Sequence, residues 1–105
     1  ARAPEIRLDD HQLVVDGWSY DASIARTDIV SVELRNDLPN ITHRTNGYGD
    51  RRRLRGWFRV EGRGEGQVFV DRSRPPFLDI VHADGFLLVQ GRDATHTREL
   101  AEALR

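Results

Sequence analysis

The residues that could do chemistry are concentrated in one stretch of the chain, residues 44–64. This stretch reads RTNGYGDRRRLRGWFRVEGRG and carries seven arginines, three of them consecutive, against only Asp50 and Glu61. Guanidinium groups form bidentate hydrogen bonds with carboxylates and phosphates, and they stack on aromatic rings. The stretch therefore predicts a face for anionic or protein partners. The residues of this predicted face are Arg44, Asn46, Tyr48, Arg51, Arg52, Arg53, Arg55, Trp57 and Arg59.

A structural interpretation of the same stretch remains open. On a polar outer strand the arginines could simply cover Trp57, and each such pair would stabilise the fold by roughly 0.5 to 1 kcal/mol. Asn46-Gly47 favours a turn with positive φ, and Gly49 adds a second tight point. We therefore expect residues 36–52 to form the longest irregular connection in the chain.

Metal and cofactor chemistry has little support elsewhere in the sequence. The histidines lack the short spacings of common metal sites, and the chain has no cysteine. Gly62, Gly64 and Gly66 link two expected strands, so no helix N-terminus follows them to orient amides at a phosphate. No metal and no cofactor are expected. The four histidines are His11, His43, His82 and His96.

Nucleophilic catalysis has equally little support. The serines lie on expected strands or turns without the strand-turn-helix elbow that exposes a catalytic serine. The sequence therefore predicts a protein that is not an enzyme. The serines are Ser19, Ser23, Ser31 and Ser73.

Length and charge predict one domain, residues 1–105, without a general attraction to nucleic acid. The chain has 105 residues and a net charge of −1, so the positive charge of residues 44–64 is offset elsewhere. No nucleic acid partner is expected. Because the chain begins at Ala1 without a methionine, we expect it to be processed or excised from a longer protein.

Hydrophobic periodicity predicts mainly β-structure. In residues 29–37, Val30, Val32 and Leu34 share one face. In residues 53–61, Leu54, Gly56, Phe58 and Val60 point one way, while the arginines and Trp57 point the other. Strands are expected over residues 5–8, 12–15, 18–24, 29–37, 53–61, 67–71, 77–83 and 86–90.

One helix is expected at the C-terminal end. Asp93 is its expected N-cap, and Thr97, Leu100, Ala101 and Leu104 recur at helical spacing. A helix of this length is marginal alone, so it should pack on the sheet.

An aspartate stands out in the apolar segment PFLDIVHA. Asp79 would be costly there without partners, so an ion pair with Arg72 or Arg74 is expected.

Three short motifs resemble the pattern of small bacterial pleckstrin-homology-like (PH-like) domains. They are Arg44-Thr45-Asn46-Gly47, then Gly49, then Gly56-Trp57-Phe58. The resemblance implies a PH-like seven-stranded bent antiparallel barrel, capped by one C-terminal α-helix and lacking a catalytic centre. The phosphoinositide pocket of eukaryotic PH domains does not carry over, because residues 5–18 hold Arg7 beside four acidic residues.

The resemblance implies a binding or assembly role. The first expectation is a non-enzymatic module for protein-protein contacts, including self-association into a homo-oligomer. The family often stands next to membrane-spanning segments, so a membrane-anchored parent with this domain on its cytoplasmic face is one alternative for location. The second expectation is binding of acidic lipid headgroups or other phosphorylated ligands through the arginine-rich stretch.

Overall fold

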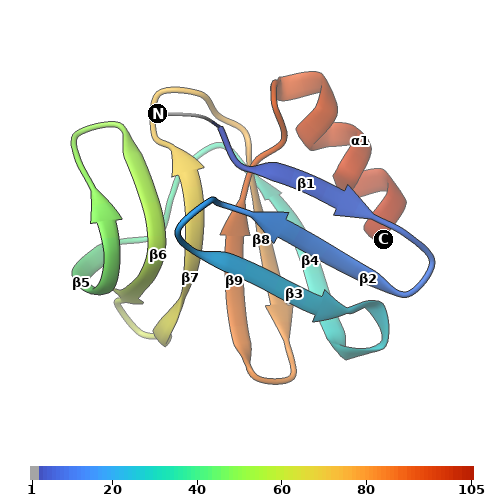
Figure 1. Cartoon of the computed structure of the whole chain (residues 1–105), viewed down its shortest axis with the longest axis horizontal. Helices are drawn as coiled ribbons and strands as arrows, with labels where there is room; N and C mark the ends of the chain where they lie inside the picture. Colours follow the sequence, from blue (N-terminus) through green and yellow to red (C-terminus); the bar gives the residue numbers. More distant parts are fainter. Residues whose placement is uncertain (1–2) are drawn as a thin grey trace.

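The computed structural model describes residues 3–105, which form two β-sheets and a C-terminal α-helix (Figure 1). The chain is mainly β-structure, as the sequence predicts. The elements in chain order are β1 (Glu5–Leu8), β2 (Gln12–Asp16), β3 (Asp21–Ala25), a 3-10 turn (Arg26–Asp28), β4 (Ile29–Arg35), β5 (Ile41–Gly49), β6 (Arg53–Val60), β7 (Gly64–Asp71), β8 (Phe77–His82), β9 (Gly85–Val89) and α1 (Ala94–Leu104).

The nine strands of residues 3–105 divide into a small sheet and a large sheet. The small sheet has the order β1-β2-β3, and the large sheet has the order β4-β8-β9-β7-β6-β5. Neighbouring strands are antiparallel except β7 and β9, which are parallel. Figure 1 shows the small sheet crossing in front of the large one, with α1 beside it. The prediction of a seven-stranded antiparallel barrel was wrong in strand number, and the two sheets do not form a closed barrel.

The large sheet is strongly curled. Strands β4 and β5 lie at its opposite edges, yet only residues 36–40 connect them. Six peptide steps span at most about 22 Å, whereas five strand spacings would separate the edges of a flat sheet by about 24 Å. The sheet therefore has to bend so that this short connection can cross between its edges.

The two faces of the large sheet bury two different cores. One core lies between the sheets and includes Leu13, Ile24, Phe69 and Leu87. The second core is formed by Leu54, Phe58, Val60, Val68, Val70, Phe77, Phe86 and Leu88, with Leu38 and Ile41 packed against it. The apolar side chains of β7 and β9 alternate between the two cores because successive residues of a strand face opposite sides.

The C-terminal helix confirms the sequence prediction. The Asp93 carboxylate accepts a hydrogen bond from the His96 backbone N–H at 2.8 Å, which satisfies one of the free amides of the first turn. Thr97, Leu100 and Ala101 are buried, and α1 packs against β4 and β8. The helix is therefore held by its apolar face, as a helix of this length requires.

Residues 36–52 were predicted to form a long irregular loop, but most of them form strand β5. Asn46-Gly47 was expected to form a turn, but both residues lie inside β5 and pair with β6. Gly47 faces Gly56, where the strands come so close that a Cβ on Gly56 would lie 2.6 Å from the Asn46 carbonyl oxygen. Gly56 also has a φ of +115°, which side chains rarely adopt. Here glycine permits close pairing of two strands.

Two further strand predictions were wrong in detail. Residues 18–24 were expected to form a strand, but β3 begins only at Asp21, after a turn in which Trp18 has a φ of +72°. Val30 was expected to face the core and is 72 % exposed. A β-bulge between Ile29 and Ser31 turns it outward.

The predicted partners of Asp79 were also wrong. Asp79 is 3 % exposed, and its carboxylate binds Arg63 through two hydrogen bonds of 2.8 and 2.9 Å and Arg35 at 3.3 Å. The Arg63 guanidinium carbon also lies over the Phe86 ring, 4.4 Å from the ring centroid. We call Asp79, Arg63 and Arg35 the Asp79 centre. Arg72 and Arg74 follow β7, at the end of that strand away from Arg63, and Arg74 lies 3.7 Å from a different carboxylate, that of Asp71.

Candidate functional site

The three consecutive arginines lie in a turn that Asp50 organises. One Asp50 carboxylate oxygen accepts the backbone N–H groups of Arg52 and Arg53, each at 2.8 Å, and the other accepts the Tyr48 hydroxyl at 2.7 Å. The bond from the Arg53 amide, followed by that from Tyr48, holds the pKa of Asp50 well below its usual range. The turn between β5 and β6 is therefore fixed by a carboxylate that remains ionised.

Arg55 lies at the base of the site. Its side chain was expected to face solvent with the other arginines of β6, but the residue is only 9 % exposed. Its Nη1 donates to the carbonyl oxygens of Leu54 at 3.2 Å and Val70 at 3.3 Å. Burial lowers the pKa of the Arg55 guanidinium, and the neighbouring positive charges of Arg53 and Arg74 lower it further. Arg55 thus sits in a crowded positive environment.

Asp71, at the end of β7, provides the carboxylate of this environment. Arg52 Nη2 lies 3.1 Å and Arg74 Nε 3.7 Å from the same Asp71 oxygen. The other oxygen accepts the Ser73 backbone N–H at 2.9 Å and its hydroxyl at 2.6 Å. Burial alone raises the pKa of Asp71, but the Ser73 and Arg52 hydrogen bonds outweigh it and lower the pKa to about 2. Asp71 is therefore ionised at neutral pH.

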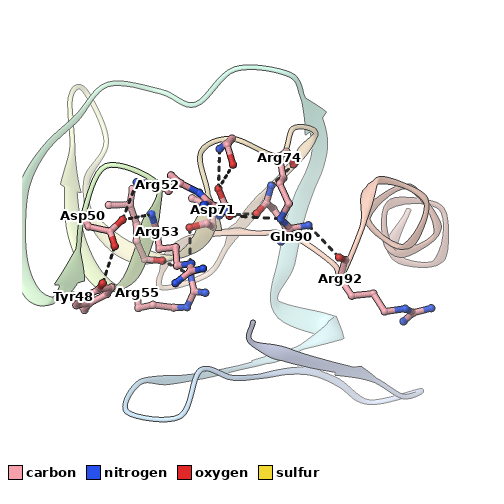
Figure 2. A network of polar contacts seen from close by, with 12 residues as sticks. Tyr48, Asp50, Arg52, Arg53, Arg55, Asp71, Arg74, Gln90 and Arg92 are labelled. Atoms are coloured by element: carbon pink, nitrogen blue, oxygen red, sulfur yellow. Dashed lines mark hydrogen bonds and ion pairs between the residues drawn. The ribbon is translucent and has the colours of Figure 1, made fainter. Parts of the chain in front are cut away.

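Two more arginines reach the site from the other side. Arg74 lies in the β7–β8 connection, and its Nη1 donates to the Arg92 carbonyl oxygen at 3.1 Å. Gln90 fixes this region, since its side chain accepts the Asp71 backbone N–H at 2.7 Å and donates to the Arg74 carbonyl oxygen. Figure 2 shows Arg52, Arg53 and Arg55 on one side of Asp71, with Arg74 and Arg92 on the other.

Together these side chains line a groove of about 280 Å³. Its charged lining consists of five arginines and one aspartate, a local balance of about +4. Within residues 3–105, the guanidinium groups of Arg53 and Arg92 make no hydrogen bond or ion pair. We call this feature the arginine groove. Its lining residues are Ala3, Arg52, Arg53, Arg55, Asp71, Arg74 and Arg92.

The structure divides the predicted face into two parts. Arg52, Arg53 and Arg55 line the arginine groove, and Arg51 lies beside them in the Asp50 turn. Tyr48 pairs with Arg55 across the strands and so borders this part. The remaining residues lie farther along the β5–β6 hairpin, where Asn46 pairs with Trp57, Arg44 with Phe58, and Arg59 with His43.

Trp57 belongs to the opposite half of the hairpin. It faces away from the core, as the alternation of β6 predicts, and is 37 % exposed. It borders a recess of about 60 Å³ that includes Glu65, His82 and Phe86 near the β8–β9 turn. Trp57 and the arginines therefore border different hollows, and their combination in one binding face stays a prediction.

Four residues of the site were missed by sequence reasoning. Arg74, Arg92, Asp71 and Gln90 are 19 or more residues from Arg52 along the chain, and no local spacing connects them to it. Asp50 had a detectable signal, because an aspartate two and three residues before the amides it binds is typical of an Asx-type turn. Arg74 was noticed but assigned to Asp79.

No family model, curated protein or solved structure matches this chain. The resemblance to bacterial PH-like domains thus stays a prediction.

The described residues were also searched for other kinds of site. Between residues 3 and 105, no group of three or more histidine, aspartate or glutamate side chains is placed to hold a metal ion. In the same part of the chain, no helix has the length and apolar character to cross a membrane.

Proposed function

We propose that this domain is a non-enzymatic binding module that takes up a phosphate-bearing ligand in the arginine groove. The observation that carries the proposal is the charge imbalance of a concave site, where five guanidinium groups face one carboxylate. Ligand pockets usually measure about 300 to 1,000 Å³, so a groove of about 280 Å³ suits a small anionic group.

Electrostatics supports an anionic ligand over a neutral one. Burial lowers the pKa of Arg55 most, and the positive charges of Arg53 and Arg74 lower it further, so the guanidinium groups of this site repel one another. An anion placed among them relieves this repulsion and accepts charge-assisted hydrogen bonds, which are stronger than neutral ones. The guanidinium groups of Arg53 and Arg92 can donate hydrogen bonds to such a ligand without breaking a hydrogen bond or ion pair to the described residues.

Calorimetric titration with inorganic phosphate at constant ionic strength tests the proposal. We expect binding by the wild-type domain and loss of binding in the Arg53→Ala/Arg92→Ala variant. The matched control is Arg7→Ala/Arg98→Ala, which removes the same charge from two exposed positions outside the groove. If the control loses phosphate binding to the same extent, general charge rather than the groove binds the anion, and the proposal fails.

The source of the phosphate can be tested separately. Vesicles of phosphatidylcholine with and without phosphatidylserine present the anion on a lipid, whereas inorganic phosphate presents it free. Co-sedimentation with acidic vesicles that depends on Arg53 and Arg92 and weakens with salt indicates a lipid headgroup. Binding of free phosphate without co-sedimentation indicates a soluble ligand.

A contact with protein, including a second copy, is the other candidate function. It is favoured by the placement of exposed Trp57 and Tyr48 on the β5–β6 hairpin, whose outer strand β5 is an edge of the large sheet. Tryptophan, tyrosine and arginine are the residues that anchor protein interfaces, and edge strands can pair with other chains.

Sedimentation velocity over a range of concentrations tests self-association. We expect a concentration-dependent dimer that is weakened by Trp57→Ala and unaffected by Val30→Ala, which truncates an even more exposed apolar side chain on the opposite edge strand. A strict monomer at high concentration contradicts the homo-oligomer version.

A further inference from the structure

We infer that the arginine groove binds a ligand with two linked anionic groups, one held on each side of Asp71. This inference rests on the proposed function and specifies its ligand class. The simplest ligands of this kind carry two phosphate groups joined by a short bridge.

The groove has two walls that come from separate parts of the chain. Arg52 and Arg53 come from the β5–β6 turn and the start of β6, whereas Arg74 and Arg92 come from the segments that follow β7 and β9. Figure 2 shows that Asp71 and Gln90 lie between these two sets of side chains. Each wall carries one guanidinium without a hydrogen bond or ion pair in the described chain, namely Arg53 on one side and Arg92 on the other.

The carboxylate between the walls disfavours a single central anion. Asp71 is ionised and already engages Arg52 and Arg74 through one oxygen. A phosphate placed directly over it would compete for the same two guanidinium groups and be repelled by the carboxylate. Two anionic groups placed on either side avoid that repulsion and reach the guanidinium groups of Arg53 and Arg92.

Asp71 and Gln90 also hold the two walls at a fixed distance from each other. Asp71 connects Arg52 to Arg74, and Gln90 connects the Asp71 amide to the Arg74 carbonyl. These links limit how far the walls can move apart. The affinity of a ligand that spans them should therefore depend on the distance between its two anionic groups. A rigid site binds most tightly the ligand whose spacing matches that of the two walls.

A series of alkanediphosphonates provides the test, because they share two phosphonate groups and differ only in the length of the linker. Affinities are measured by calorimetry at pH 8 and constant ionic strength, with methylphosphonate as the single-anion reference. We expect one linker length to bind about tenfold more tightly than the others, which is the effect of one additional charge-assisted contact. In Arg92→Ala this preference should disappear, while the fold, checked by circular dichroism, and the preference of the control Arg98→Ala should be unchanged.

The outcomes separate this inference from the proposed function. If methylphosphonate and all diphosphonates bind through Arg53 with no dependence on linker length, the two-anion inference is wrong and anion binding stands. Retention of the linker preference in Arg92→Ala likewise overturns the inference. If no phosphonate binds at all, the proposed function itself fails.

Discussion

The Asp79 centre and the arginine groove use the same residue types in opposite ways. At the Asp79 centre, Arg63 and Arg35 meet a buried carboxylate, and Arg35 also lies 3.9 Å from Glu33. Two arginines therefore face two acids. In the arginine groove five arginines face one acid, and two of their guanidinium groups have no hydrogen bond or ion pair within residues 3–105.

The difference shows that a surplus of positive charge over negative charge, rather than the number of arginines, marks a candidate binding site. A buried carboxylate needs its partners, so a balanced centre contributes to the fold. A surplus of guanidinium groups costs repulsion without stabilising the fold. Such a surplus is reasonable where a ligand supplies the missing negative charge.

The largest effect should come from unbalancing the Asp79 centre. Arg63→Ala leaves the Asp79 carboxylate buried with only the longer contact to Arg35, and we expect the free energy of unfolding to fall by about 3 kcal/mol. Urea denaturation measures this change. The control Arg63→Met/Asp79→Leu removes both charges and should recover most of the loss; if it is as unstable as Arg63→Ala, lost packing rather than charge is the cause.

The close pairing of β5 with β6 should give the next largest effect. Gly56→Ala places a Cβ against the Asn46 carbonyl at a positive φ, and we expect a loss of about 2 kcal/mol with weaker phosphate binding, because the Asp50 turn shifts with β5. Gly62→Ala is the matched control, since it also has positive φ but nothing within 4 Å of the added atom. An equal loss in both variants would attribute the effect to φ alone.

A smaller effect is expected from the titration of Asp71. Its pKa is about 2 in the folded protein and about 3.9 in an unfolded chain. The stabilisation from this lowered pKa is therefore complete above about pH 4 and is lost as the pH falls towards 2. Urea midpoints measured from pH 5 to pH 2 should decline less steeply in Asp71→Asn than in the wild type. Parallel declines would show that the Asp71 ion pairs do not contribute to acid stability.

The smallest effect should be that of Arg53→Ala on stability. Because the Arg53 side chain makes no hydrogen bond or ion pair within the described residues, the free energy of unfolding without added anion should change by less than about 0.5 kcal/mol. Thermal unfolding with and without inorganic phosphate checks this, since the wild type should gain more stability from the anion than the variant, which keeps only Arg92 as an unpaired guanidinium of the groove within the described residues. A large loss in the absence of anion would instead make Arg53 a structural residue like Arg63.

Much of the fold follows from local sequence signals. The alternation of residues 53–61 placed Phe58 inside and Trp57 outside, and Asp93 marked the start of α1. Strand β5 was missed because its TNGYG segment has the composition of a turn. Its position is set by close backbone pairing with Gly56 in the next strand, β6, and the turn composition of the segment does not reveal that pairing.

The sequence by itself determined that arginines are dense near residues 51–59 and that β6 has one apolar and one polar face, because both depend on neighbours along the chain. Only the tertiary structure decided which arginines act together. Antiparallel pairing of β6 with β7 and parallel pairing of β7 with β9 bring the ends of β7 and β9 to the start of β6. Arg74 and Arg92 therefore join Arg52, Arg53 and Arg55, while Arg63 binds Asp79. The physical reason is that electrostatic interactions depend on distance in space and on burial, and both are set when the two sheets pack.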